Sequence, residues 1–226
     1  MDSIMQSASR DTARDTARKP YRAVLLFGAP GAGKGTIGKV LGSIPGFVHL
    51  ACGDIFRNLD LTSPLGKTFV DYSSRGLLVP DDHTIALWKE TIDSWAATRI
   101  FSPERDVLVL DGIPRNVEQA RIIDPYLQVE KIFYLVCSDE NLMIERLRRR
   151  ALKENRLDDA SDEVIRRRWR VYEEETQPVL DSFPAETIQQ VDAIGTPVEV
   201  LYTILGHLVA DIQASRKTSD LRDKTS

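Results

Sequence analysis

The chain has 226 residues and a formal net charge of −4 at pH 7, with 42% hydrophobic and 28% charged residues. This length suits one globular domain with small inserted lobes, and the charge excludes a global attraction to nucleic acid or to an anionic membrane. The two cysteines, Cys52 and Cys137, lack metal-ligand spacing. Neither a disulfide framework nor a zinc site is therefore expected, and a reducing, cytoplasmic location is the default.

The first twenty residues differ in composition from the rest of the chain. They contain a tandem DTAR and three arginines, as an organelle transit segment could, but their three aspartates argue against that function. We expect residues 1–20 to be a disordered or helical extension and residues 214–226 a disordered tail, on either side of one domain at 21–213. No apolar run approaches the roughly 20 residues of a membrane span, so no membrane contact is expected.

The middle of the chain alternates between predicted strands and predicted helices. Short apolar runs predict buried strands at 23–28, 107–111, 131–137 and 186–192, with a further candidate at 47–54. Helical spacing predicts amphipathic helices at 34–42, 64–75, 81–98, 116–127, 139–152, 161–182 and 197–213. This alternation indicates an α/β fold with a parallel five-stranded sheet and helices on both faces. Functional residues should then directly follow strands, because ligands bind beyond the carboxyl ends.

A glycine-rich segment, GAPGAGKGT at 28–36, follows the first predicted strand and opens a helix. It matches the phosphate-binding loop pattern G-x-x-x-x-G-K-[ST] at its glycines and at Lys34, where a bound phosphate would stabilise the charge. The pattern's magnesium-binding hydroxyl is missing, because Gly35 follows the lysine and the hydroxyl comes one residue late, at Thr36. The alternative reading is a plain glycine-rich turn between a strand and a helix.

Two further segments carry charges suited to phosphoryl chemistry. DGIPR at 111–115 follows the next clear strand; Asp111 there is placed like a metal-linked carboxylate, and Arg115 suits a phosphoryl group. The alternative is an Asp cap beside a surface Arg. In RLRRRALKENRLDD at 146–159, Arg146 and Arg150 share a helix face and Arg156 follows a short polar stretch. That run is also compatible with a solvated basic helix.

Four segments, taken in order, resemble the adenylate kinases of the nucleoside monophosphate kinase family. They are GAPGAGKGT, ACGDIFRN, GLLVPD with DGIPRNVEQA, and RLDD with RRRWRVYEEETQPVL, and the resemblance covers about residues 22–210. It implies a P-loop NTPase-like fold with an inserted AMP-binding lobe at 51–79 and a short lid at 149–159. It also implies a monomer that binds ATP, AMP and ADP and transfers the γ-phosphoryl group of MgATP reversibly to AMP, serving adenine nucleotide homeostasis.

The resemblance assigns roles by position. The ATP-binding residues would be Gly31, Ala32, Gly33, Lys34, Gly35, Thr36, Arg146, Arg150 and Gly195. The AMP-binding residues would be Cys52, Arg57, Leu77, Leu78, Val79, Gly112, Ile113, Pro114, Arg115, Gln119, Arg156 and Arg168. The catalytic residues would be Lys34, Arg115, Arg150, Arg156 and Arg168. Arg168 is preferred to Arg167 because it directly precedes the bulky Trp169.

The departures from the family pattern shape the remaining expectations. Only five residues separate Arg150 from Arg156, so the longer lid with its occasional zinc site is absent. With Gly35 beside Lys34, magnesium would be held by phosphates and water, with Asp54 and Asp111 gripping that water. Two alternatives stay open: a UMP/CMP kinase, because IPRN occurs in pyrimidine-nucleotide kinases, and a non-catalytic nucleotide-binding module. Gln119, whose amide could pair with adenine, favours AMP.

Overall fold

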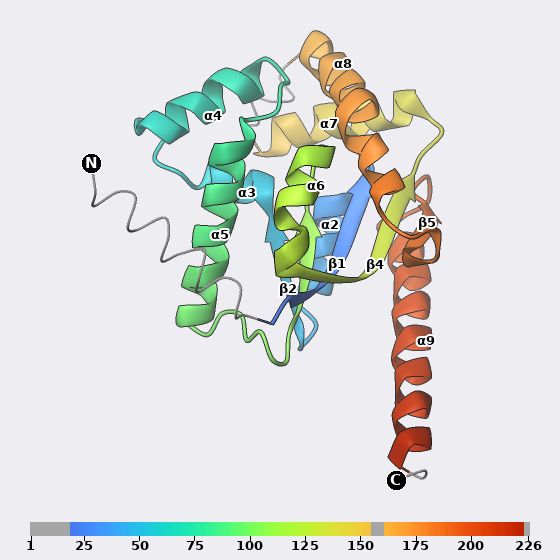
Figure 1. Cartoon of the computed structure of the whole chain (residues 1–226). Coiled ribbons are helices and arrows are strands. Elements are labelled where there is room, and N and C mark those ends of the chain that lie inside the picture. The colour runs from blue at the N-terminus through green and yellow to red at the C-terminus, as the bar shows by residue number, and fades with distance from the viewer. Residues whose placement is uncertain (1–18, 155–160, 224–226) are drawn as a thin grey trace, which may run out of the picture.

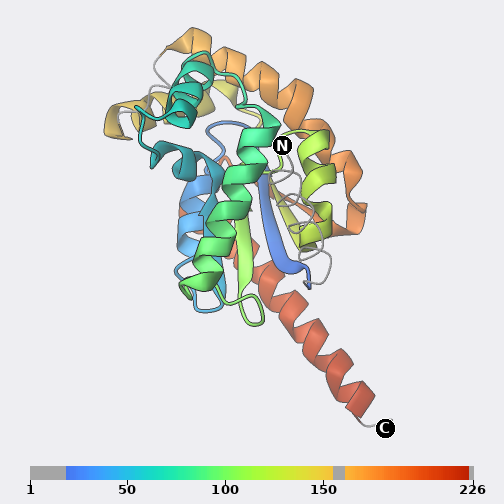
Figure 2. The ribbon, with the colours of Figure 1, turned by 60° about the vertical axis from the view of Figure 1, so that its left-hand side comes forward.

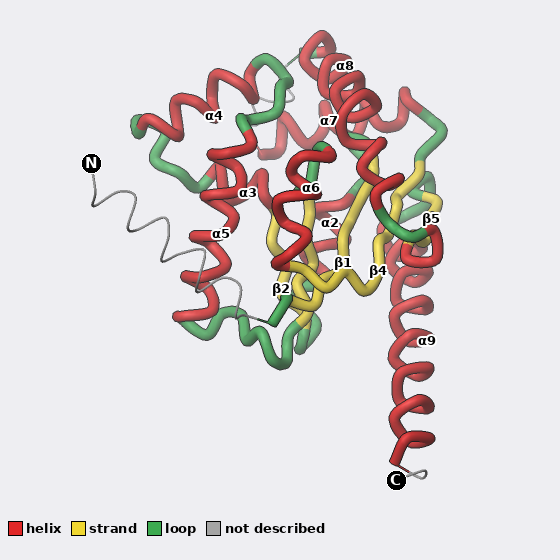
Figure 3. The backbone as a smooth tube through the Cα atoms, viewed as in Figure 1, coloured by secondary structure: helices red, strands yellow, loops and turns green. Residues whose placement is uncertain are grey.

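The computed structural model describes residues 19–154 and 161–223. Its centre is a five-stranded sheet of order β2-β3-β1-β4-β5 in which neighbouring strands are parallel. The strands are β1 (Tyr21–Gly28), β2 (Phe47–Ala51), β3 (Val107–Asp111), β4 (Leu127–Val136) and β5 (Ile188–Asp192). The expected parallel α/β sheet is therefore confirmed, and Figure 3 shows its strands between layers of helix.

The helices cover both faces of the sheet (Figure 1). One layer contains α3 (Cys52–Arg57), α5 (Asp81–Ala97) and α6 (Val117–Ile123), and the other contains α2 (Lys34–Leu41), α7 (Glu140–Glu154) and α9 (Pro197–Asp223). The central strand explains why both faces are covered. Leu25 and Phe27 of β1 enter the first hydrophobic core and Leu26 enters the second, because successive side chains of a strand point to opposite faces.

The remaining elements lie around the carboxyl ends of the strands or connect the layers. α4 (Pro64–Ser74) lies with α3 in the segment expected to be an inserted lobe, away from the sheet (Figures 1 and 2). α8 (Asp162–Val171) follows α7, and short 3-10 segments occur at η1 (Asp124–Tyr126), η4 (Gln177–Ser182) and η5 (Ala185–Thr187). A π-helical turn, η3 (Tyr172–Thr176), continues directly from α8. Within the described ranges, no helix has the length and apolar character needed to cross a bilayer.

Several predicted boundaries differ from the structure: the strand expected at 131–137 is β4, which begins at Leu127, and the helix expected at 116–127 is α6, which ends at Ile123. The strand candidate 47–54 ends at Ala51, and Cys52 begins α3. The helix expected at 161–182 divides into α8, η3 and η4, since Pro178 has no N–H to continue regular bonding. The last helix does not end at 213, because neither Gly nor Pro interrupts it after Gly206: α9 runs to Asp223. Its first part packs on the sheet, and its C-terminal part extends away from the body (Figure 2). Residues 1–18 lie outside the described ranges.

Candidate active site

A cavity of about 740 Å³ opens beyond the carboxyl ends of β1, β2 and β3. Its volume falls within the range of small-molecule sites. Its wall comes from the 28–36 loop, the α3–α4 segment, the loop after β3, α7, α8 and the start of α9. The elements that the sequence indicated as functional therefore meet at one place, as expected for the edge where parallel strands end.

The glycine-rich loop takes a conformation that other residues adopt only with strain. Gly31 has a φ of 92°, and a Cβ at Gly31 would lie 2.9 Å from the Met143 carbonyl oxygen of α7. Gly33 caps the start of α2 with a φ of 94° and has open space around it. The loop therefore wraps the first turn of α2, where unpaired N–H groups and the helix dipole attract anions.

Lys34 is the first residue of α2 and bonds back to its own loop. Its Nζ donates to the Gly28 carbonyl oxygen at 2.6 Å and to the Ala29 carbonyl oxygen at 3.2 Å. Burial lowers the pKa of the Lys34 ammonium to about 8. The Asp111 carboxylate opposes this change, whereas the charges of Arg115, Arg150 and Arg168 add to it. Four cationic side chains from four segments therefore converge around one point beside one carboxylate.

Asp111 ends β3 and faces the position where the loop lacks a hydroxyl. A Cβ at Gly35 would lie 3.5 Å from Asp111 Oδ2, an ordinary contact distance. Asp54 also lines the cavity, and its Oδ1 accepts from Arg57 Nη2 at 2.5 Å. Among the described residues, no group of three or more His, Cys, Asp or Glu side chains could hold a metal ion. Two carboxylates in a wet cavity suit a hydrated divalent ion better than a fully protein-bound one.

The loop after β3 presents Arg115 through a chain of internal hydrogen bonds. Gly112, with a φ of 77°, lets the Arg115 side chain fold over it, and Arg115 Nε donates to the Gly112 carbonyl oxygen at 2.9 Å. The Arg115 N–H donates to Gln119 Oε1 at 2.8 Å. Gln119 Nε2 in turn donates to Asp81 Oδ1 at 2.7 Å, and Asn116 Nδ2 donates to the same carboxylate at 3.0 Å. The start of α5 thereby fixes the loop.

Arg146 closes the opposite end of the cavity against the segment before α9. Its Nη1 donates to the Ala193 carbonyl oxygen at 2.7 Å, and its Nη2 donates to the carbonyl oxygens of Ile194 and Gly195 at 3.1 and 3.3 Å. Pro197 and Val200 line the cavity beside it. A planar guanidinium held next to apolar side chains offers a flat surface on which a base can stack.

Most of the predicted site residues line this cavity. They are Gly31, Ala32, Gly33, Lys34, Gly35, Thr36, Asp54, Arg57, Leu77, Leu78, Val79, Asp111, Gly112, Pro114, Arg115, Arg146, Arg150, Arg168 and Gly195. Arg167, the rejected alternative to Arg168, is not among the described lining residues. Arg156 and part of the expected 149–159 lid lie outside the described residues.

Three predicted residues do not belong to the described lining. Cys52 and Ile113 are 4% and 2% exposed and pack in the core, and burial raises the pKa of the Cys52 thiol to about 11. Gln119 is 1% exposed and both ends of its amide bind protein groups. The reason is local: Cys52 and Ile113 pack into the hydrophobic core and Gln119 turns to the Arg115 N–H and to Asp81, whereas neighbouring residues line the cavity.

The sequence analysis missed several residues of the lining. Arg149 and Lys153 lie with Arg146 and Arg150 on one face of α7, so the spacing of three, four and seven residues could have found them. Tyr172 and Thr176 follow Arg168 at intervals of four and also line the cavity. Their helical spacing is visible in the sequence, but the π-helical turn between them is not.

Known proteins give independent evidence. A family model described as adenylate kinase matches residues 26–188. An adenylate kinase of Thermobifida fusca is 38% identical over 183 residues, covering 78% of this chain and 92% of its own. An adenylate kinase of Thermus thermophilus is 37% identical over 185 residues, covering 79% and 92%, and one of Flavobacterium psychrophilum is 34% identical over 184 residues, covering 78% and 93%.

Proposed function

The chain belongs to the adenylate kinase family, and on that premise we propose that it transfers the γ-phosphoryl group of MgATP to AMP, reversibly, giving two ADP. The observation that carries this proposal is that Arg115, Arg150 and Arg168 line the same cavity as Lys34, where their charges act on its ammonium. Phosphoryl transfer passes through a state whose charge is spread over the equatorial oxygens, so it needs several fixed cations around one point.

The donor nucleotide would bind along the glycine-rich loop. The N–H groups from Gly31 to Thr36 would surround its phosphates, and Lys34 would exchange the Gly28 carbonyl oxygen for a phosphate oxygen. Its adenine would lie on the Arg146 guanidinium, between Gly195 and the apolar start of α9. Arg150 would contact the transferring phosphoryl group, and Arg156 would contact the phosphates from the lid.

The acceptor would bind on the other side of the cavity. Arg57 and Arg115 would hold the AMP phosphate, and the backbone of Leu77 to Val79 would line the base pocket. Gln119 supports this side by fixing Arg115, because its amide already binds the Arg115 N–H and Asp81. Arg168 would bridge the two phosphate groups from α8.

The proposed chemistry is positional rather than covalent. No nucleophilic side chain is required, since AMP itself supplies the attacking oxygen, and the arginines offset charge on the phosphates. Asp54 and Asp111 fit a hydrated magnesium ion and would hold it through water molecules. When bound with ATP, the ion neutralises phosphate charge. A cavity that closes around both nucleotides would exclude water and suppress ATP hydrolysis.

The test is a magnesium-dependent assay of ADP formation with ATP and each of AMP, CMP, UMP and GMP. We expect AMP to give the highest kcat/KM. A tenfold preference for CMP, which is about 1.4 kcal/mol in transition-state binding, would replace the AMP assignment with a UMP/CMP kinase. ATP binding without ADP formation from any acceptor would instead support a non-catalytic module.

We further infer that the working unit is a cytoplasmic monomer that needs neither zinc nor a nucleic-acid or membrane partner. Sedimentation at assay concentrations tests this inference, and activity found only in a dimer fraction would contradict it. The requirement for zinc is tested by adding a zinc chelator in the presence of excess magnesium. Activity that persists after chelation would show that the enzyme needs no zinc.

A further inference from the structure

The helical segment from α8 into η3 presents three side chains to the cavity. Arg168, Tyr172 and Thr176 follow one another at intervals of four residues, so they lie on one face of this segment. All three side chains line the cavity. Within η3, the Gln177 N–H donates to the Tyr172 carbonyl oxygen, five residues back, which is the pattern of a π-helical turn.

Thr176 uses this position to hold the loop that carries Arg115. Its Oγ1 donates to the Arg115 carbonyl oxygen at 2.7 Å, although 61 positions separate the two residues. The N–H of the same residue donates to Gln119 Oε1 at 2.8 Å. The Arg115 backbone is therefore fixed on both sides, by Gln119 from α6 and by Thr176 from η3. Its guanidinium is fixed in turn through Nε and the Gly112 carbonyl oxygen.

The same helical segment also packs against the lobe on the acceptor side. A Cβ at Gly76 would lie 2.9 Å from the Val164 carbonyl oxygen and 3.1 Å from Cγ of Arg168. The segment from α8 to η3 therefore touches the acceptor side at two places, under Arg168 and at Arg115. These contacts connect Arg168 of α8 with Arg115 of the loop after β3, although the two residues are far apart in the chain.

We propose that Thr176 is a positioning residue for the acceptor phosphate. Its hydroxyl fixes the Arg115 carbonyl and ties the Arg115 loop to the helical segment that carries Arg168, so that both guanidinium groups are set before AMP binds. The hydroxyl keeps its proton and contacts no reacting atom. This inference rests on the proposed function.

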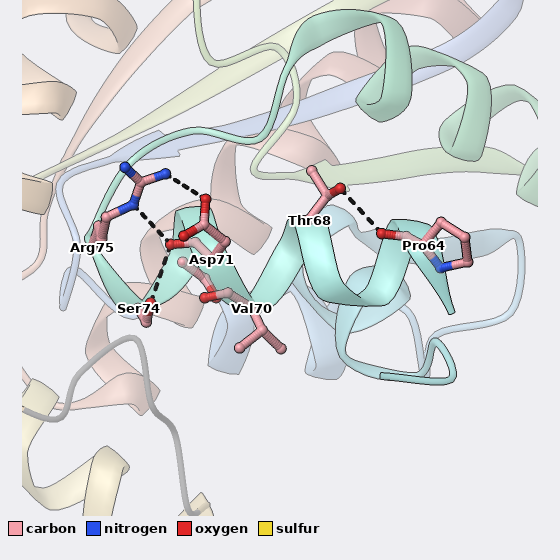
Figure 4. A network of polar contacts seen from close by, with 7 residues as sticks. Pro64, Thr68, Val70, Asp71, Ser74 and Arg75 are labelled. Atoms are coloured by element: carbon pink, nitrogen blue, oxygen red, sulfur yellow. Dashed lines mark hydrogen bonds and ion pairs between the residues drawn. The ribbon is translucent and has the colours of Figure 1, made fainter. Parts of the chain in front are cut away.

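The experiment compares Thr176→Val, which keeps the side-chain shape without the hydroxyl, with Thr176→Ser, which keeps the donor. Thr68→Val is the matched control, because the Thr68 hydroxyl donates to the Pro64 carbonyl oxygen at 3.1 Å within α4 (Figure 4). Measurements are KM for AMP, KM for ATP, kcat, the thermal midpoint, and calorimetric titration of AMP without ATP. The last of these reports acceptor binding independently of turnover.

Loss of one neutral hydrogen bond predicts that Thr176→Val weakens AMP binding and raises KM for AMP by about fivefold. KM for ATP should stay within about twofold, and Thr176→Ser and Thr68→Val should match the wild type for both substrates. Unchanged AMP binding in Thr176→Val, or equal losses for AMP and ATP with a lowered thermal midpoint, would overturn the positioning role. A wild-type protein that forms no ADP would overturn the proposed function instead.

Discussion

The ammonium of Lys34 should make the nucleotide-free protein more stable as the pH rises from about 8 to 10.5. Burial lowers the pKa of Lys34 from 10.5 to about 8. Between these values the unfolded chain keeps the proton that the folded chain has lost, so the free energy of unfolding increases with pH. At ~1.4 kcal/mol per pKa unit the whole effect is about 3 kcal/mol, an upper bound because water in the cavity screens the charge.

Urea unfolding of the wild type and of Lys34→Met measures this effect. The difference between the two proteins cancels titrations elsewhere in the chain. From about pH 7 to about pH 9.5 the wild type should gain up to ~2 kcal/mol relative to Lys34→Met. Lys39→Met is the matched control, since Lys39 lies exposed on the same helix.

A wild-type difference from Lys34→Met that stays constant to within ~0.5 kcal/mol would refute the reasoning, because a well-hydrated ammonium would have no reason to lose its proton early. Bound ATP gives a second check. Its phosphates favour the charged form and should raise the pKa of Lys34. The pH dependence of this difference should therefore shrink in saturating nucleotide, and ATP should bind more weakly as the pH rises above about 8 in the wild type.

Further variants test three other parts of the structure. Asp111→Asn should lower magnesium-dependent turnover at least tenfold more than it lowers ATP affinity. Gly35→Ser should leave magnesium affinity unchanged. Both predictions are tested by titrating each variant with magnesium and with ATP. Gly76→Ala should cost about 1–2 kcal/mol in urea unfolding, since its φ is 70° and α8 leaves no room for a Cβ, and an unchanged midpoint would contradict this packing. Ile204→Ala should cost about 2–5 kcal/mol, while its control Tyr202→Ser, 80% exposed, should stay within ~0.5 kcal/mol.

The sequence was sufficient for the features that depend on neighbouring residues. Alternating apolar runs predicted the buried strands, and the glycine spacing before Lys34 predicted the anion-binding loop, because both patterns report local backbone requirements. The convergence of Arg115, Arg150 and Arg168 then followed from topology, since the carboxyl ends of parallel strands meet at one edge.

The sequence was insufficient where a side chain's partner lies far along the chain. Gln119 has the right amide for an adenine contact, but Asp81, 38 positions earlier, already accepts from it. The π-helical turn at Thr176 is equally hidden, because one displaced hydrogen bond leaves no compositional mark. Burial of Cys52 rather than exposure to the cavity is decided by the direction of the first turn of α3, which a strand prediction through 47–54 could not give.

The glycine that follows Lys34 is best understood together with Asp111. A side chain there would stand in contact with the Asp111 carboxylate, since the Gly35 Cβ position lies 3.5 Å from Oδ2. With glycine at this position, no side chain stands between the Asp111 carboxylate and the loop. The Asp111 charge acts on Lys34, where it opposes the lowering of the ammonium pKa by burial. An ion that keeps most of its water needs this room more than it needs another direct ligand. The carboxylate and the glycine therefore work as a pair: removing the first should impair the ion, and filling the second should add nothing.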